Sequence, residues 1–371
     1  MNLSYWEIKS YVSNIDFTVV GSGIVGLNCA LGLKARFPKA NILILERGVL
    51  PQGASTKNAG FACFGSLSEI LDDLKTHSEN EVIELIEKRR KGLSLLRQTL
   101  SDKAISYQQH GGYELFDQEN PEGFHNCMSQ MAYVNAILKP HFKKDVFEVK
   151  DNLFNFENIQ EQLSFTSLEG QIDTGRMMRS LTHLVQSKGV LILNSISVEN
   201  FEELNDHVHV KTNLFDFKTN RMLICTNGFA SNLLAIEVKP ARAQVLITKP
   251  IKNLSIRGTF HLDKGYYYFR NIDSRILLGG GRNLDFKTEE TAEMGQTEII
   301  QNKLEALLKT TILPATTFEI DQRWSGIMGV GNTKKPIVKQ LSSKVFCAVR
   351  LGGMGIAIGS NVGRELADLV D

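Results

Sequence analysis

Residues 15–46 read IDFTVVGSGIVGLNCALGLKARFPKANILILE, and this stretch decides the fold. It begins with a short apolar run that is rich in β-branched residues, and a glycine-rich turn follows. Apolar residues then recur at helical spacing before a second apolar run ends on Glu46. A strand pattern, a helix pattern and a second strand pattern in this order predict a β-α-β unit.

The glycine-rich turn, GSGIVG at 21–26, predicts a site for a dinucleotide. Gly21 allows a tight turn out of the strand, Gly23 lets the backbone approach a pyrophosphate, and Gly26 lets the helix pack closely on the strand. The N–H groups and the positive dipole end of the helix point at the phosphates. Glu46 lies where an acidic side chain accepts hydrogen bonds from the adenosine ribose. The alternative interpretation is a glycine-rich turn in an ordinary α/β domain.

The chain has 371 residues, of which 42% are hydrophobic and 22% are charged, and its formal net charge is +1. This length suits one large domain or two closely packed ones, and the composition is typical of a globular protein. Because the net charge is so small, no dedicated surface for nucleic acid is expected. The N-terminal segment lacks the features of a secretory signal, and no apolar run approaches the ~20 residues that span a bilayer. We therefore expect a cytoplasmic protein without a membrane span.

Five cysteines are scattered along the chain, and no two of them have CxxC spacing. This pattern predicts neither a disulfide framework nor a zinc framework. His207 and His209 share one face of a predicted strand, but no third ligand accompanies them. No metal site is therefore expected.

The strand pattern changes in the second half of the chain. Residues 221–227 form a continuous apolar run, which is typical of a parallel strand that is buried on both faces. From 241 to 281 the pattern has a period of two, and turn residues separate the runs, which predicts an antiparallel sheet. We therefore predict an α/β fold with a Rossmann-like domain on a central parallel sheet and a second α+β lobe on an antiparallel sheet. The expected boundaries are 1–85, 160–235 and 320–371 for the first domain, and 86–159 and 236–319 for the second lobe.

Residues 81–100 predict an amphipathic helix with an apolar stripe. The stripe comprises Val82, Leu85, Ile86, Leu93 and Leu96. The same helix contains the basic run KRRK at 88–91, and glutamates precede this run. We interpret the basic run as a solvated helix face.

Two segments carry a resemblance to a known family. The loop 51–62, PQGASTKNAGFA, follows Glu46, and the segment 349–360, VRLGGMGIAIGS, precedes a C-terminal helix. Both resemble the D-amino-acid-oxidase-like family of flavoproteins, the group of glycine oxidase, sarcosine oxidase and the D-amino-acid dehydrogenases. The resemblance implies FAD, not NAD, as the cofactor. It also implies non-covalent binding, because no histidine follows Ser55-Thr56.

The same resemblance and the glycine-rich turn together indicate which residues contact the cofactor. They are Gly21, Ser22, Gly23, Ile24, Val25, Gly26, Glu46, Arg47, Gly53, Ala54, Ser55, Thr56, Asn58, Ala59, Gly60, Val198, Asn227, Gly228, Gly353, Met354, Gly355, Ile356 and Ala357.

The resemblance implies an enzyme that oxidises the C–N bond of an amine or amino acid by hydride transfer to flavin N5, after which the imine hydrolyses. The electrons would pass to oxygen, a quinone or another acceptor. One alternative is a flavoprotein subunit that is active only in a multi-protein dehydrogenase. A second is a flavoenzyme of the tRNA-modifying type, which the near-neutral charge disfavours. The sequence does not indicate the oligomeric state.

The substrate site is expected to involve Tyr266, Arg270, Arg350 and Trp324. Tyr266 and Arg270 share one face of a predicted strand, and Arg350 precedes the glycine-rich segment at the C-terminus. Relatives that act on small amino acids often contain a Trp-x-Gly-x-Arg-Pro segment whose arginine binds the carboxylate. Here Met328 occupies the place of that arginine. We therefore expect Arg270 or Arg350 to bind an anionic group of the substrate.

Overall fold

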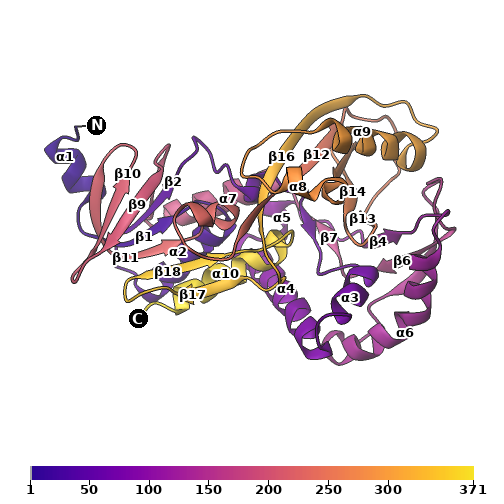
Figure 1. The fold of residues 1–371 in the computed structure, drawn as a ribbon, viewed down its shortest axis with the longest axis horizontal. Coiled ribbons are helices and arrows are strands. Elements are labelled where there is room, and N and C mark those ends of the chain that lie inside the picture. Colours follow the sequence, from indigo (N-terminus) through magenta and orange to yellow (C-terminus); the bar gives the residue numbers. More distant parts are fainter. Residues whose placement is uncertain (1) are drawn as a thin grey trace.

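The structure is a computed structural model that describes residues 2–371, and it contains two eight-stranded sheets in two adjoining lobes (Figure 1). The first sheet has the strand order β17-β18-β11-β1-β2-β8. The bounds are β1 (Ile15–Val20), β2 (Ile42–Glu46), β8 (Leu191–Asn194), β11 (Asp216–Ile224), β17 (Ile337–Gln340) and β18 (Val345–Val349). Strands β9 (Val198–Glu203) and β10 (Val208–Thr212) extend this sheet from β11 in antiparallel pairs. The parallel pairing of β1 with β2 and with β11 confirms the predicted β-α-β unit and central parallel sheet.

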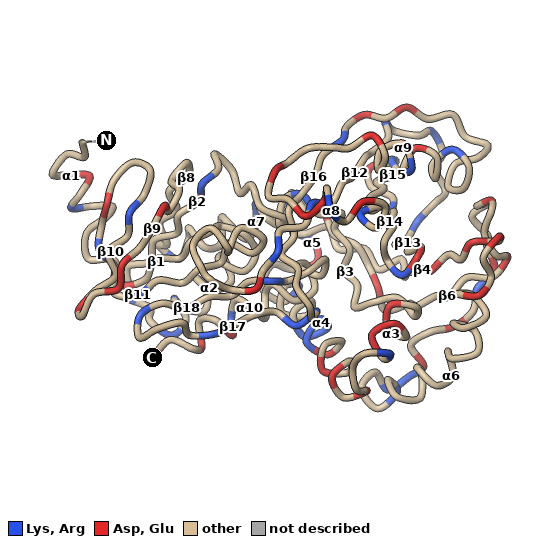
Figure 2. Tube along the Cα trace, viewed as in Figure 1, with Lys and Arg blue, Asp and Glu red and all other residues tan. Residues whose placement is uncertain are grey.

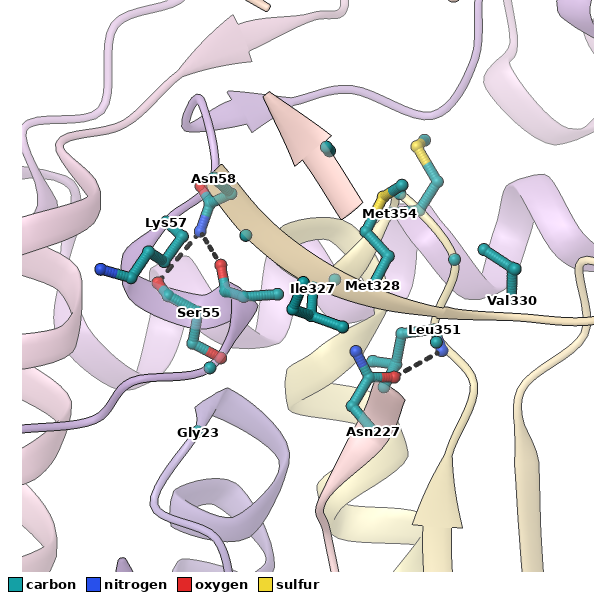
Figure 3. A pocket seen from close by; sticks show the side chains of 18 of the residues that line it. Gly23, Ser55, Lys57, Asn58, Asn227, Ile327, Met328, Val330, Leu351 and Met354 are labelled. Atoms are coloured by element: carbon teal, nitrogen blue, oxygen red, sulfur yellow. Dashed lines mark hydrogen bonds between the residues drawn. The ribbon is translucent and has the colours of Figure 1, made fainter. Parts of the chain in front are cut away.

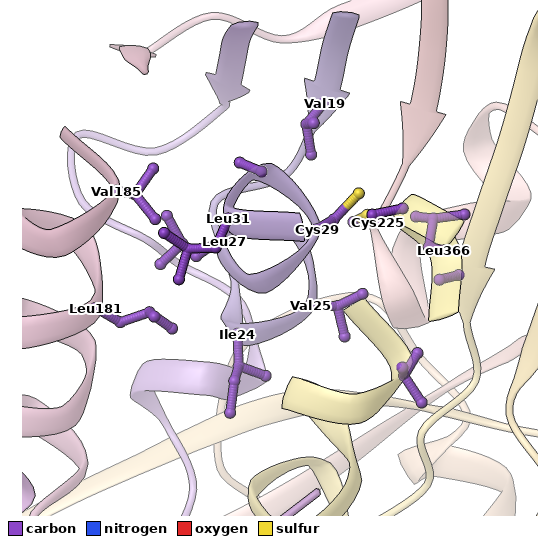
Figure 4. Close-up of a cluster of buried hydrophobic side chains, with 14 of the residues drawn as sticks. Val19, Ile24, Val25, Leu27, Cys29, Leu31, Leu181, Val185, Cys225 and Leu366 are labelled. Atoms are coloured by element: carbon purple, nitrogen blue, oxygen red, sulfur yellow. The ribbon is translucent and has the colours of Figure 1, made fainter. Parts of the chain in front are cut away.

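Three helices cover the first sheet and build its core. Helix α2 (Ile24–Arg36) connects β1 to β2, and it packs against α7 (Thr174–Ser187) and α10 (Gly355–Asp368). Figure 4 shows the apolar side chains of α2 between those of α7 and α10, and the cluster is fully buried at Leu27 and Leu181. Helix α4 (Glu79–Leu100) packs against α10 as well. This packing fixes the N-terminal ends of α2 and α10 relative to each other.

The second sheet has the order β16-β12-β15-β14-β13-β4-β6-β5 and is antiparallel except for the β13–β4 pair. Its aromatic core lies against α9 (Glu298–Leu307), where Phe260 and Phe269 stack with their ring centroids 4.6 Å apart. Helices α3 (Leu67–Leu74) and α6 (Glu122–Phe142) form a further apolar cluster with α4. The strands are β4 (Gly112–Leu115), β5 (Glu148–Asp151), β6 (Gln162–Thr166), β12 (Lys239–Thr248), β13 (Thr259–Leu262), β14 (Tyr267–Ile272), β15 (Arg275–Gly280) and β16 (Ile320–Val330).

Short elements join these parts. They are α1 (Tyr5–Glu7), η1 (Ile8–Val12), η2 (Ala54–Thr56), β3 (Phe61–Ala62), α5 (Asp102–Ile105), β7 (Gly170–Gln171), η3 (Asn227–Asn232), η4 (Arg282–Leu284), α8 (Phe286–Glu289) and η5 (Leu308–Ile312). The pair β3–β7 forms a separate two-stranded sheet.

Three segments belong to the other lobe from the one that the expected domain boundaries assign to them. Strand β16, expected in the first domain, pairs with β12 of the second sheet along its length, and β6 also belongs to the second sheet. Residues 86–100 of α4, expected in the second lobe, pack against α10 of the first. The cause is general: periodicity identifies a strand or a helix, but it does not identify the sheet or the helix that an element joins.

Charges of both signs are mixed over both lobes, and a short basic run marks α4 (Figure 2). Within residues 2–371, none of the helices combines the length and the apolar character that crossing a bilayer requires.

Candidate active site

A cavity of about 670 Å³ extends from the turn after β1 to Tyr268 of β14. Its middle part lies where the loop 53–60, strand β16 and the segment 351–354 meet (Figure 3). Most of the residues that the sequence assigns to the cofactor line this one cavity. They are Gly21, Gly23, Ile24, Val25, Glu46, Arg47, Gly53, Ala54, Ser55, Asn58, Ala59, Gly60, Val198, Asn227, Gly353, Met354, Gly355, Ile356 and Ala357.

Four further residues of that set lie behind the wall of the cavity and shape it. The hydroxyl of Ser22 donates to Glu46 at 2.7 Å, and that of Thr56 donates to the carbonyl of Pro51 at 2.6 Å. A β-carbon at Gly26 would overlap the carbonyl oxygen of Gly21, so only glycine allows this approach of α2 to β1. Gly228 similarly lies against the carbonyl of Met328.

The buried carboxylate of Glu46 marks one end of the cavity. One oxygen accepts from the N–H of Ser22 at 3.1 Å, and the other accepts from the N–H of Gly48 at 3.0 Å. These bonds hold the carboxylate at the C-terminal edge of β2, where it lines the cavity. A carboxylate at this edge has the position that ribose recognition requires.

Bare backbone faces open space along the rest of the cavity. A β-carbon built at Gly53, Gly352 or Gly355 would meet no atom within 4 Å. The first N–H groups of α2 and α10 also lie at the cavity wall, and such groups have no partner within their own helix. Two helix N-termini that face one cavity suit the phosphates and the electron-rich ring edge of FAD, although the N–H of Ile24 itself donates to the hydroxyl of Ser55. The residues present therefore fit the expected dinucleotide.

Replacing Glu46 with alanine should weaken FAD binding by about 1–3 kcal/mol, because a buried hydrogen-bonding carboxylate is lost. The measurement is the dissociation constant from FAD titration of the apoprotein. The matched control is Glu202→Ala, because Glu202 is an exposed carboxylate on β9. Equal affinities in the wild type and the Glu46 variant would show that this carboxylate does not bind the cofactor.

The loop that carries Ser55 is held by its own side chains. The amide of Asn58 donates to the carbonyls of Ala54 at 3.1 Å and Ser55 at 3.0 Å (Figure 3). The hydroxyl of Ser55 accepts from the N–H of Ile24 at 2.9 Å. The loop therefore stays at the N-terminus of α2. On the opposite side, Asn227 accepts from the N–H of Leu351 at 3.2 Å and positions the segment before α10.

Trp324 does not line the cavity, which corrects its expected catalytic role. Its indole N–H donates to the carbonyl of Lys57 at 2.9 Å, and its ring belongs to an apolar cluster with Ala59 and Val245. Trp324 therefore supports the loop 53–60 from behind, because β16 joins the second sheet at this point.

Arg270 is likewise turned away from the cavity, although it shares a strand face with the cavity residue Tyr268. Its side chain is only 2% exposed, and its guanidinium donates to the carbonyls of Ala59 and Ile172, the latter at 2.9 Å. Burial lowers the pKa of Arg270 to about 10, against the raising effect of Asp173 and Asp273. Because the donors of the guanidinium are engaged by these carbonyls, they are not available to a ligand in the cavity. The expected substrate contact of Arg270 is therefore wrong.

Arg350 and Tyr266 both line the cavity, as expected. The guanidinium of Arg350 is held by the carbonyl of Lys335 at 3.1 Å and by the hydroxyl of Thr333 at 3.1 Å. Tyr266 is 37% exposed and lies just before β14, and its ring contacts that of Phe286 edge to face. Tyr266 is therefore a partly exposed part of the cavity wall, and the guanidinium of Arg350 already has acceptors within the chain.

Arg89 of α4 is a cavity residue that the sequence analysis missed. It belongs to the basic run that was interpreted as a solvated face, yet it is only 4% exposed. A β-carbon at Gly92, one turn along, would overlap the carbonyl of Ala357, so α4 lies directly on α10 and the side of α4 that carries Gly92 is buried. Arg89 lies at the centre of the apolar stripe, three residues after Ile86 and four before Leu93, and this position was the available signal.

The far end of the cavity is aromatic and contains further titratable groups. The rings of Phe61 and Tyr268 meet edge to face, with their centroids 5.6 Å apart, and burial raises the pKa of Tyr268 to about 12. His261 of β13 donates from its ring to Glu169 at 3.1 Å. Burial alone would lower the pKa of His261, but the carboxylates of Glu169, Glu69 and Glu114 outweigh it and raise the pKa to about 9. Cys63 lies beside this pair.

Comparisons with known proteins agree with this geometry. The family model described as FAD dependent oxidoreductase matches residues 16–369. The chain is 20% identical to the probable oxidoreductase OrdL of Haemophilus influenzae, over 97% of this chain and 83% of that protein. The fold is similar to glycine oxidase from Bacillus cereus, with a TM-score of 0.77, 15% identity and coverage of 96% and 94% of the two chains. It is also similar to L-proline dehydrogenase from P. horikoshii, with a TM-score of 0.75, 18% identity and coverage of 96% and 93%.

Proposed function

The chain belongs to the family of FAD-dependent oxidoreductases, and on that premise we propose that it oxidises the C–N bond of an amine that carries a carboxylate, as amino acids do. The names of the similar structures, glycine oxidase and L-proline dehydrogenase, support a substrate of this class. The observation that carries the proposal is that Arg89 is buried at the cavity without a carboxylate partner.

Three arginines are buried among residues 2–371, and they differ in their partners. Arg242 forms a two-pronged ion pair with Glu289, and Arg270 donates to backbone carbonyls. Arg89 donates one bond, to the carbonyl of Phe64 at 2.6 Å, and its Nε has no acceptor. Arg89 also forms no ion pair within the described part of the chain, and it lines the cavity. A buried cation without a counter-charge is costly, so this arginine suits an anionic group of a ligand.

Three of the other cations at this cavity already have partners of their own. Lys264 and Lys334 lie near carboxylates, at 3.6 Å from Asp72 and 2.6 Å from Asp73 respectively. The guanidinium of Arg350 already donates to the carbonyl of Lys335 and to the hydroxyl of Thr333. We therefore infer that Arg89 takes the role that the sequence analysis gave to Arg270 or Arg350, and that it replaces the arginine absent at Met328.

The remaining cavity residues serve orientation and desolvation. When bound, FAD supplies the acceptor for a hydride from the carbon that bears nitrogen. The apolar walls at Phe61, Val245 and Ile327 exclude water and disfavour the ammonium form, so the amine is held neutral, as hydride release requires. The N–H groups of Gly355 and Ile356 at the start of α10 line the cavity and would stabilise negative charge at the edge of a bound cofactor. The product imine is hydrolysed by water, and oxygen, a quinone or another acceptor takes up the electrons.

The test is a screen of D- and L-amino acids and of simple amines, with an artificial electron acceptor and with oxygen. We expect turnover with a carboxylate-bearing amine, and FAD that is released intact by acid because it is not covalently bound. Turnover confined to amines without an anion would contradict the proposal. FAD binding without any turnover, restored by a partner protein, would instead support the subunit alternative.

A further inference from the structure

Three potential metal ligands meet at the inner end of the cavity. The Sγ of Cys63, a carboxylate oxygen of Glu169 and a ring nitrogen of His261 all lie within 4.8 Å of one another. All three side chains are buried, and Cys63 and His261 line the cavity. They come from separate parts of the chain: Cys63 follows β3, Glu169 precedes β7, and His261 lies within β13.

The hydrogen bonds present do not account for the whole cluster. Oε2 of Glu169 accepts from His261 at 3.1 Å and from the hydroxyl of Thr259 at 3.3 Å. Oε1 of the same carboxylate is buried and has no partner, although Glu169 is only 1% exposed. A buried carboxylate oxygen without a donor costs free energy, so a positively charged ligand at this point would satisfy it.

The chemistry of the three ligands selects the ion. A thiolate, an imidazole and a carboxylate together suit zinc, whereas calcium and magnesium prefer oxygen alone. Zinc binds sulfur at about 2.3 Å and nitrogen or oxygen at about 2.0–2.2 Å, so neighbouring ligands of a tetrahedral ion lie about 3.3–3.6 Å apart. The three ligand atoms, all within 4.8 Å of one another, lie near this spacing. The thiol and the imidazole would release their protons to solvent as the ion binds.

We propose that Cys63, Glu169 and His261 form a binding site for Zn²⁺, whose fourth coordination position opens to the cavity. Three protein ligands with one open position are the arrangement in which zinc remains accessible to a small molecule. The sequence analysis expected no metal site because it considered only the spacing of residues along the sequence, and this proposal departs from that expectation. The site does not depend on the identity of the amine substrate.

The test uses the FAD-loaded protein, freed of metal by a chelator and then dialysed against Zn²⁺. We expect one Zn²⁺ per chain, which metal analysis measures directly. Co²⁺ in its place should give the visible bands of a tetrahedral site with a thiolate ligand, to the red of the absorption of the oxidised flavin. Cys63→Ser and His261→Gln should each weaken Zn²⁺ binding by at least about tenfold, the smallest effect typical even of residues that only support a ligand.

The matched control is Cys127→Ser, since Cys127 is buried within α6 but lies outside the cluster. Its zinc affinity should equal that of the wild type. Flavin content and the melting temperature show whether each variant is folded. Glu169→Gln provides a third variant if His261→Gln does not fold. Absence of stoichiometric zinc, or equal affinity in the wild type and Cys63→Ser, would overturn the proposal.

Discussion

Replacing Arg89 with methionine should lower kcat/KM for a carboxylate-bearing amine by about 30- to 1000-fold, which corresponds to about 2–4 kcal/mol. The reason is that Arg89 is the buried arginine that faces the cavity without a carboxylate partner. Methionine retains the length and apolar character of the stem, so the contacts of α4 with α10 remain. The loss should appear mainly in KM, because the interaction is made in the ground state as well as in the transition state.

The control for this variant is Arg90→Met, one residue along the same helix. Arg90 is exposed and donates to the carbonyl of His141 at 2.9 Å, away from the cavity. Its kinetics should match the wild type, and the flavin content of both variants should be unchanged. If Arg89→Met retains wild-type kinetics on the best carboxylate substrate, the anion is bound elsewhere.

Replacing Arg270 with methionine should instead destabilise the protein by about 3 kcal/mol or more. The change removes the donors to the buried carbonyls of Ala59 and Ile172, and each buried carbonyl left without a donor costs about 1–3 kcal/mol. Because Ala59 belongs to the loop at the cavity, FAD retention should fall as well. Denaturant unfolding gives the free energy of unfolding, and gel filtration followed by absorbance gives the retained flavin.

Arg176→Met is the comparison for this second variant. Arg176 is exposed on α7 and donates to the hydroxyl of Ser106 at 2.6 Å, so its loss should cost no more than about 0.5 kcal/mol. A stable Arg270→Met protein that retains its full FAD content and has a raised KM would restore Arg270 as the substrate anchor and contradict its structural role behind the cavity wall.

The dinucleotide end was predictable from the sequence because its residues are close together in the chain. The turn at 21–26 and Glu46 lie within one β-α-β unit, so local spacing already fixes their geometry. The segment before α10 was identified by resemblance, and the structure brings it to the same cavity.

The substrate end was less predictable because distant segments build it. Arg270 shares a strand face with the cavity residue Tyr268, but the carbonyls that bind its guanidinium come from two remote loops. Arg89 was hidden in a basic run, and only the packing of Gly92 against α10 shows that this side of the helix is buried. The cluster at Cys63 likewise depends on β3, β7 and β13 meeting, which periodicity does not reveal.

The central claim is that this FAD enzyme oxidises an amine whose carboxylate is bound by Arg89. Its most direct test is anaerobic mixing of the oxidised enzyme with an amino acid and, separately, with the matched amine that lacks the carboxylate, while the flavin absorbance is recorded. We predict that the best amino acid of the screen bleaches the flavin in the wild type, that the matched amine bleaches it far more slowly, and that Arg89→Met removes this difference. Equal bleaching rates for the two compounds in the wild type would contradict the claim.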